Sequence, residues 1–375
     1  MKILVLNRGS SSIKCSVYDL DTLPEEPQEP IWEDKIEWKN IYNQGSNQIE
    51  EAFRSLFKKM KIDCIGHRIV HGGKKYKQSV RIDPKVKAEI RNLSGLAPLH
   101  NAQDLEGIEI LEKLFPGVPQ VAVFDTSFHR TMPHAAKWYG GPYRWVEEVI
   151  ERYGFHGISF QYCARQVPKI LGKKIGRMVV CHLGSGASLC AIEHGKSVDT
   201  TMGFTPLEGL MMDTRSGSVD PGILLYLIKE KGKSAEELSE ELYEKSGLLG
   251  FSGISSDMRD ILKGADEGNQ RAAATLEVYI HRLISAIGSM AAVLGGIDAL
   301  IFTAGIGENA SQIREKVCKR LSFLGISLSD SKNNTATSDS EISEPNSKVK
   351  VAVIQTQEAF EIARECWQVH RGKGL

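Results

Sequence analysis

The sequence lacks the cysteine pairing that is typical of disulfide-bonded and zinc-binding proteins. Its seven cysteines are odd in number and scattered, and no C-x-x-C pair occurs. A structural zinc site or a disulfide framework needs closer pairing than this. We therefore expect the cysteines to be reduced, buried core residues.

The sequence also lacks an excess of charge of either sign and a long apolar run. Lys plus Arg and Asp plus Glu are equal at 47 each, so the formal net charge is zero. This balance argues against nucleic acid as the main partner, since phosphate backbones attract basic domains. No apolar run reaches the ~20 residues that span a bilayer. The start of the sequence has no signal-peptide pattern, and we expect a cytoplasmic protein with no membrane partner.

Two common nucleotide-binding motifs are absent. The chain has no G-x-x-x-x-G-K-[ST] motif, and its glycine-rich segment at residues 305–307 is not part of a G-x-G-x-x-G sequence. P-loop and Rossmann interpretations are therefore disfavoured. Any phosphate-binding turn must be of another kind.

Two similar hairpins are present. Apolar residues 3–6 precede a Gly/Ser turn at residues 8–12 and a second strand pattern at residues 13–20. The same sequence of features recurs as strand 178–183, turn 184–188 and strand 189–193. The repetition suggests that each half of the chain begins with the same supersecondary unit. The length of 375 residues favours two or three domains.

Strand and helix patterns alternate along the rest of the chain, which indicates an α/β fold. The strand patterns cover residues 64–70, 121–124, 299–303 and 349–354. The helix patterns cover residues 49–60, 272–294, 311–321 and a segment from about residue 358. We expect a surface loop at the polar residues 329–347 and an exposed connection at residues 24–30.

The polar residues most suited to chemistry stand beside glycines or at strand ends. Backbone amides and hydroxyls of the two Gly/Ser turns could bind phosphate, although plain hairpin turns use the same residues. Arg68 and Arg215 lie in glycine-containing segments, where an arginine can bind an anion with two donors. Asp125 and Glu358 follow apolar strands and could bind Mg²⁺, but a helix-start acid would look the same.

Nine segments taken in order resemble the acetate kinase family over almost the whole chain. They are residues 7–12 (NRGSSS), 66–73 (GHRIVHGG), 97–101 (APLHN), 124–129 (FDTSFH), 153–157 (YGFHG), 202–209 (MGFTPLEG), 214–217 (TRSG), 255–260 (SSDMRD) and 302–309 (FTAGIGEN).

The resemblance implies two ribonuclease-H-like lobes of the acetate/sugar kinase–Hsc70–actin fold, with an active-site cleft between the lobes. It places the N-terminal lobe at residues 1–126 plus 360–375 and the nucleotide-binding lobe at residues 127–359. It also implies a homodimer and a reversible, Mg²⁺-dependent reaction, with Mn²⁺ able to substitute. ATP and acetate would give ADP and acetyl phosphate by direct in-line transfer.

The resemblance further implies a role for each matching residue. The catalytic residues would be Arg68, Asp125, His156 and Arg215, with His156 and Arg215 supporting the transition state, and His100 and His182 would be supportive. The metal residues would be Asn7 and Glu358. The acyl pocket would be formed by Arg68, Val70, Leu99, Phe155 and Pro206. The nucleotide and its phosphates would be bound by Lys14, His182, Leu183, Gly184, Ser185, Gly186, Asp257, Met258, Arg259, Gly305, Ile306, Gly307, Glu308 and Asn309.

Four residues depart from the family pattern. Ser185 replaces a usual Asn, Phe160 a frequent His, Asp213 a common Gly and Ser218 a common acid. Because Ser has one O–H donor and Asn has two N–H donors, we expect the first change to weaken phosphate binding. On this basis Ser185→Asn is expected to lower the KM for ATP a few-fold and to leave the KM for acetate nearly unchanged.

Three alternatives to an acetate kinase stay open from the sequence. A propionate or butyrate kinase would use the same chemistry, although Val70 favours a small pocket. A pyrophosphate-dependent kinase is disfavoured by the intact segment at residues 305–309. A non-catalytic nucleotide clamp is disfavoured because Arg68, Asp125 and Arg215 are all present.

Overall fold

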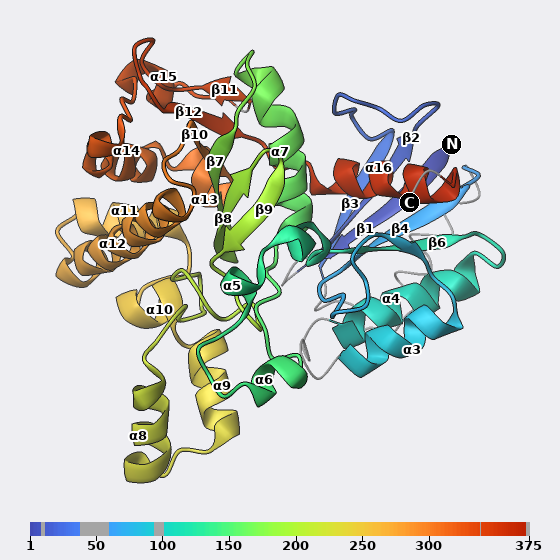
Figure 1. Ribbon diagram of the computed structural model, residues 1–375, viewed down its shortest axis with the longest axis horizontal. Coiled ribbons are helices and arrows are strands. Elements are labelled where there is room, and N and C mark those ends of the chain that lie inside the picture. The colour runs from blue at the N-terminus through green and yellow to red at the C-terminus, as the bar shows by residue number, and fades with distance from the viewer. Residues whose placement is uncertain (9–11, 38–59, 94–100, 338, 373–375) are drawn as a thin grey trace. The chain divides into compact units, whose positions relative to one another are not determined.

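The computed structural model describes residues 1–8, 12–37, 60–93, 101–337 and 339–372 (Figure 1). The chain divides into two compact units. Unit 1 comprises Met1–Arg130, Gly157–Tyr162 and Gln357–Leu375, and unit 2 comprises Thr131–His156 and Cys163–Thr356. The lobe boundaries that the resemblance implies stay a prediction.

Unit 1 contains a mixed sheet of six strands within its described residues, in the order β3-β2-β1-β4-β6-β5. The strands are β1 (Lys2–Arg8), β2 (Ser12–Asp19), β3 (Trp32–Glu37), β4 (Cys64–Ile69), β5 (Val80–Arg81) and β6 (Gln120–Phe124). β1 and β2 form an antiparallel hairpin, and β4 and β6 continue the sheet in parallel with β1. The predicted strands of this half are confirmed.

Helices cover both faces of this sheet because its central strands are apolar on both sides. They are α3 (Pro84–Asn92), α4 (Asn101–Leu114) and α16 (Glu358–His370), with the short η2 (Ser127–Thr131). On one face, Leu4 and Ile65 pack with Leu111 of α4. On the other face α16 lies against β1 and β4, so closely that a Cβ on Gly66 would stand 2.5 Å from Cys366 Sγ. The absence of a side chain at Gly66 permits this approach.

Unit 2 repeats the same sheet plan. Its described residues form six strands in the order β11-β12-β10-β7-β8-β9. They are β7 (Arg177–Leu183), β8 (Ala187–Glu193), β9 (Lys196–Thr200), β10 (Ala299–Thr303), β11 (Ser340–Glu341) and β12 (Lys350–Ile354). β7 and β8 form the hairpin, and β10 and β12 run parallel to β7. The prediction that each half opens with the same unit is confirmed.

The helices of unit 2 differ in how close they lie to this sheet (Figure 1). They are α5 (His134–Lys137), α6 (Arg144–Glu147), α8 (Pro221–Lys231), α9 (Ala235–Glu244), α10 (Gly247–Ser252), α11 (Met258–Asp266), α12 (Gln270–Val293), α13 (Ala304–Asn309), α14 (Ser311–Arg320), η3 (Ser322–Leu324) and α15 (Asp330–Asn334), while α7 (Gly157–Ile170) begins in unit 1. Of these, α8 and α9 stand away from the sheet (Figure 1). Among the described helices, α12 alone has the length and apolar composition of a membrane span. It packs against β8 and α11 and buries Tyr279, Leu283 and Ile287, as a core helix does.

Two sequence expectations need comment. The loop expected at residues 329–347 contains α15 and β11. One of its polar residues, Asn333, accepts a hydrogen bond from the buried Arg314 (Nε to Oδ1, 2.8 Å). The helix expected at residues 49–60 and the middle of the first Gly/Ser turn lie largely outside the described residues.

Candidate active site

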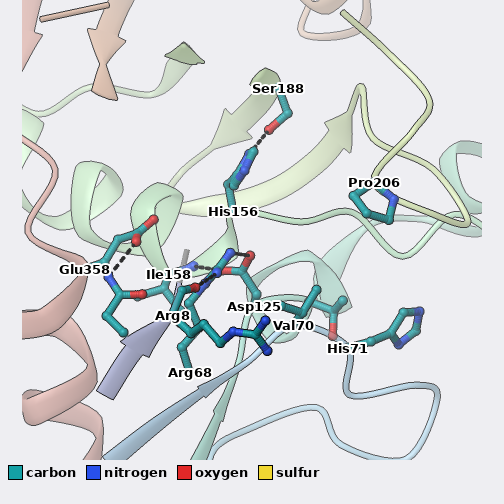
Figure 2. A network of polar contacts seen from close by, with 12 residues as sticks. Arg8, Arg68, Val70, His71, Asp125, His156, Ile158, Ser188, Pro206 and Glu358 are labelled. Carbon is teal, nitrogen blue, oxygen red and sulfur yellow. Dashed lines mark hydrogen bonds and ion pairs between the residues drawn. The ribbon is translucent and has the colours of Figure 1, made fainter. Parts of the chain in front are cut away.

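A buried ion pair lies at the ends of two neighbouring parallel strands of unit 1. Arg68 is near the end of β4, and Asp125 directly follows β6. Arg68 Nη2 donates to Asp125 Oδ2 at 2.8 Å, and Arg68 Nη1 donates to the carbonyl oxygen of Arg8 at 2.6 Å (Figure 2). The fold thus brings together two residues that the sequence analysis selected separately.

The surroundings keep this arginine charged and this aspartate fixed. Burial lowers the pKa of Arg68, but the carboxylates of Asp125 and Glu358 outweigh it and raise the pKa above its ordinary value. Asp125 is fully buried, and its carbonyl oxygen accepts a 2.8 Å hydrogen bond from Gly157 N. A Cβ on Gly157 would stand 2.1 Å from that oxygen, so a glycine is needed there. A guanidinium held in this way can bind an anion.

Asn7 and Glu358 also meet in unit 1, although they stand at opposite ends of the sequence. Asn7 is near the end of β1, and Glu358 is the first residue of α16. Asn7 Nδ2 donates to Glu358 Oε2 at 2.9 Å, one of the bonds drawn in Figure 2.

The donor set of this pair suits Mg²⁺. An amide oxygen and a carboxylate are hard oxygen ligands, and Mg²⁺ is usually held by one or two carboxylates with waters and substrate phosphates. The described residues contain no group of three or more His, Cys, Asp and Glu that could hold a metal by themselves. The oxygen atoms of Asn7 and Glu358 fit part of such a ligand set.

In unit 2, two predicted residues lie beside the second Gly/Ser turn. A Cβ on Gly186 would stand 3.0 Å from His156 Nε2 and 3.1 Å from Arg215 Nη2. His156 Nδ1 is 2.8 Å from Ser188 Oγ (Figure 2), and its ring stacks on His182 at 4.1 Å. His156 has a left-handed backbone (φ 56°) at the start of α7, a strained conformation for a histidine that is frequent at functional sites. Arg215 Nη1 donates to the Pro206 carbonyl at 2.7 Å.

A cavity of about 390 Å³ opens next to this turn. Two glycine segments line it, one between β7 and β8 and one at α13, together with the start of α11. The predicted nucleotide residues on its wall are Gly184, Ser185, Asp257, Met258, Arg259, Gly305, Ile306 and Asn309. The cavity size is within the range of small-molecule sites.

Other predicted nucleotide residues do not line this cavity. His182, Leu183 and Gly186 stand in or next to the same hairpin, whereas Gly307 and Glu308 lie in α13. Glu308 Oε1 accepts from Ala304 N and Thr356 N at 2.9 and 3.0 Å, which stabilises the glycine segment itself. Lys14 belongs to unit 1 and pairs with Glu33 at 3.0 Å.

The predicted acyl-pocket residues are divided between the units. Arg68 and Val70 belong to unit 1, and Phe155 and Pro206 belong to unit 2. Phe155 and Val70 are buried. Leu99, with His100, lies outside the described residues. The pocket stays a prediction.

The sequence analysis missed a set of contacts made by the first turn of α4. Asn101 Oδ1 accepts from His71 N and its Nδ2 donates to His71 O, both at 3.1 Å. Asp104 Oδ2 accepts from Val70 N at 3.1 Å, and Asp104 Oδ1 lies 3.6 Å from Arg8 Nη1. In the sequence, the signal for these contacts was two polar residues three positions apart at the start of a helix. Exposed helices commonly begin with the same pattern, so it did not point to buried contacts.

Two of the four departures have local structural roles. Phe160 packs edge-on against the His129 ring with a centroid distance of 5.6 Å. Ser218 Oγ accepts from Gly209 N at 3.0 Å, and Ser218 N donates to Gly209 O at 2.9 Å, so Ser218 holds the loop that follows Arg215. Neither departure removes a residue assigned to chemistry.

Comparisons with known proteins agree with these observations. The family model described as "Acetokinase family" matches residues 2–364. The acetate kinase of Gloeobacter violaceus is 50% identical and that of Nostoc punctiforme is 47% identical, in each case over 98% of this chain and 99% of the relative. Among solved structures, Porphyromonas gingivalis acetate kinase is 38% identical with a TM-score of 0.86, and a Francisella tularensis propionate kinase is 36% identical with a TM-score of 0.87. Both cover 98% of this chain and 99% of their own.

Proposed function

The chain belongs to the acetokinase family and has its α/β kinase fold, and we propose that it transfers the γ-phosphoryl group of ATP to acetate. One carboxylate oxygen of acetate forms a bond to the γ-phosphorus as the bond to the β,γ-bridging oxygen breaks. The products are acetyl phosphate and ADP, and the reaction is reversible. The observation that carries the proposal is the cavity in unit 2 between two glycine segments. This cavity suits a nucleoside diphosphate.

The nucleotide is proposed to bind with its phosphates at the Gly/Ser turn. Glycines there and at α13 let phosphate and ribose approach bare backbone. Asp257 and Arg259 form an ion pair with each other at the start of α11 and lie on the cavity wall. The two glycine segments come after strands β7 and β10.

Phosphoryl transfer needs positioning and charge stabilisation more than covalent catalysis. We assign the charge stabilisation to Arg68 and Arg215, because each can donate to oxygens of the transferring group. His156, oriented by Ser188, would donate to the same group. Acetate is already a nucleophile, so no strong base is required. Asp125 would orient Arg68 and the acyl substrate.

We propose that Asn7 and Glu358 hold Mg²⁺, with Mn²⁺ as a substitute. When bound, the metal would neutralise charge on the nucleotide phosphates. The chain itself contributes the orientation: the Asn7 amide fixes one Glu358 oxygen by its 2.9 Å hydrogen bond. The remaining oxygens of Asn7 and Glu358 would be the ligands that the chain supplies to the ion.

Propionate is the second candidate substrate, since one similar structure is that of a propionate kinase. Val70, Leu99, Phe155 and Pro206 are proposed to contact the acyl methyl group. One methylene in an apolar pocket changes specificity by only ~1–3 kcal/mol, so both acids should be accepted to different extents. We propose acetate as the preferred acid because Val70 restricts the space.

We also propose a homodimer in the cytoplasm. The apolar residues of α8 are only partly covered: Ile223, Leu225, Tyr226 and Ile228 are 46–55% exposed, and no residue of α8 is buried. Contiguous exposed apolar residues mark interaction sites. A second copy of the chain would bury these apolar side chains, whereas a nucleic acid would not.

The test is an acetyl-hydroxamate assay with acetate, propionate and butyrate in parallel. Arg68→Ala and Arg215→Ala should each lower kcat at least ~100-fold. Arg91→Ala removes an arginine that is 63% exposed on α3 and serves as the matched control. Circular dichroism should show that each variant is folded. No acyl phosphate from any acid, or half of the wild-type turnover in a folded Arg68→Ala or Arg215→Ala variant, would contradict the proposal.

A further inference from the structure

An ion pair of unit 2 joins two segments that adjoin residues proposed for catalysis. Arg152 Nη2 donates to Glu208 Oε1 at 2.8 Å. Arg152 stands four residues before His156, and Glu208 stands two residues after Pro206. The sequence analysis assigned no role to either member of the pair. We call residues 201–209 the proline loop.

Arg152 also holds the backbone where β9 meets the proline loop. Its Nη1 donates to the carbonyl oxygens of Thr200 and Thr201 at 3.2 and 3.1 Å. The planar guanidinium thus acts as a fork, with one terminal nitrogen on the start of the loop and the other on the carboxylate near its end. The backbone adds to this link, because Tyr153 N donates to Gly203 O at 3.1 Å.

The Glu208 carboxylate has a second partner, which fixes its other oxygen. Glu208 Oε2 accepts from the Tyr139 hydroxyl at 2.5 Å, and the Tyr139 oxygen accepts from Phe204 N at 2.9 Å. A Cβ on Gly203 would stand 1.7 Å from Glu208 Oε2 and 2.1 Å from the Tyr139 oxygen, so a side chain at position 203 would displace both groups. Burial raises the pKa of Tyr139, and its hydrogen bond to Glu208 raises it further, so the phenol is a proton donor at neutral pH. Both carboxylate oxygens are therefore bound by residues from outside the proline loop.

The proline loop in turn contacts Arg215. Arg215 Nη1 donates to the Pro206 carbonyl oxygen at 2.7 Å. That carbonyl is two residues from Glu208, so a shift of the loop would move the acceptor that orients the guanidinium. Arg215 Nη2 lies near the Gly/Ser turn, since a Cβ on Gly186 would stand 3.1 Å from it. A displacement of ~1 Å in a group that positions the reaction can cost on the order of 100-fold in rate.

From these contacts we propose that Glu208 is a positioning residue for phosphoryl transfer, and that with Arg152 and Tyr139 it holds the Pro206 carbonyl in place for Arg215. Glu208 acts through the loop and not on the reacting atoms. The three residues lie off the wall of the nucleotide cavity, so their loss should affect turnover and not nucleotide affinity. The inference rests on the proposed function.

The test compares turnover with nucleotide affinity in Glu208→Ala, made in the full chain. Initial rates of acetyl-hydroxamate formation at saturating ATP give kcat and the KM for acetate, and calorimetric titration with ADP gives a Kd. In the variant kcat should fall at least about tenfold, because Arg215 loses its fixed acceptor. The KM for acetate should rise, because Pro206 is also proposed to contact the acyl group. The Kd for ADP should stay within about twofold of the wild-type value.

Glu341→Ala is the matched control. Glu341 stands on β11 of unit 2 and pairs with Lys350 at 3.0 Å, and its side chain is 30% exposed against 33% for Glu208. Loss of this ion pair should leave kcat, the KM for acetate and the Kd for ADP at their wild-type values.

Two further variants test how Glu208 acts. Glu208→Gln keeps the shape and one acceptor oxygen, so its kcat should lie between those of the wild type and Glu208→Ala, and it keeps the test decisive if the alanine variant does not fold. Arg152→Ala should lower kcat by a factor similar to that of Glu208→Ala. The double variant Arg152→Ala/Glu208→Ala should lose no more than about twofold beyond either single variant, because the two side chains act as one unit.

Three results would overturn the inference. Full turnover in folded Glu208→Ala and Glu208→Gln variants would mean that the ion pair only stabilises unit 2. A loss of ADP affinity as large as the loss of kcat would mean that the change distorts unit 2 as a whole, and multiplied losses in the double variant would mean that Arg152 and Glu208 act separately. A wild type that forms no acyl phosphate would remove the proposed function and this inference with it, whereas an active wild type with unaffected variants would remove the inference alone.

Discussion

Asp104 in α4 lies near Arg8, and such a pair would ordinarily be expected to stabilise the fold. We predict instead that the ionised Asp104 lowers stability at neutral pH. Its side chain is 2% exposed. Arg8 and Arg68 attract its charge and the Val70 amide donates to it, while Asp125 repels it. Burial exceeds these favourable contacts and raises the pKa of Asp104 from 3.8 to about 6. The folded protein therefore holds this proton more tightly than the unfolded chain does.

The sign of the effect follows from proton linkage. Because the pKa is higher in the folded state, the contribution of Asp104 to the free energy of unfolding falls as pH rises from about 4 to about 6 and is constant above that. The pKa of Asp104 differs by about 2.2 between the two states (about 6 minus 3.8), which corresponds to about 3 kcal/mol in the free energy of unfolding. Ionised Asp104 thus costs stability at neutral pH, in spite of the nearby Arg8.

Asp104→Asn should remove this cost. The Asn oxygen can still accept from Val70 N, and the change removes the desolvation cost of the buried carboxylate, which outweighs its 3.6 Å contact with Arg8 in this reasoning. Measured by urea unfolding from pH 4 to pH 8, the variant should gain up to about 3 kcal/mol over the wild type at pH 7 and nothing near pH 4. Glu112→Gln, on a side chain of the same helix that is 57% exposed, should change stability by less than about 0.5 kcal/mol. A variant that is less stable than wild type at pH 7 but equal at pH 4 would show that the Arg8–Asp104 pair is net stabilising and would refute the reasoning.

Three other predictions concern the substrate, the metal and the assembly. Val70→Ala should raise the ratio of kcat/KM for propionate to that for acetate, and a constant ratio would show that Val70 does not contact the acyl group. Glu358→Ala should shift the Mg²⁺ titration of the reaction to higher concentration with little change in the circular dichroism spectrum; an unchanged titration would leave Glu358 as an ordinary helix-start acid. Tyr226→Asp on exposed α8 should convert a dimer to a monomer in light scattering, and a variant that stays dimeric would place the interface elsewhere.

The fold was predictable because its strands are buried on both faces and its hairpins recur. Apolar runs such as residues 178–183 and 299–303 become central parallel strands, where both faces are covered and no polar alternation is needed. The polar segment 329–347 was predicted as a loop, but it contains α15 and β11. Its residues satisfy the buried Arg314, a partner that no local pattern reveals.

The candidate site was predictable where strand ends determine it. Arg68 lies near the end of β4 and Asp125 follows β6, and the carboxyl ends of these neighbouring parallel strands meet at one edge of the sheet. Contacts made by helix α4 were not predictable in the same way. Asn101 and Asp104 bind backbone groups of His71 and Val70, and these pairings depend on how the helix packs against the sheet.

The pairing of Ser185 with Asp213 shows why single departures mislead when they are considered separately. From the sequence, Ser185 looked like the loss of a phosphate donor that Asn would restore. In the structure the two residues are neighbours: Asp213 N donates to Ser185 O at 3.3 Å, and both line the same cavity. An Asn at position 185 would have the Asp213 carboxylate as well as a phosphate to donate to. The gain expected from Ser185→Asn should therefore be larger when Asp213→Gly accompanies it, because that change removes the competing carboxylate.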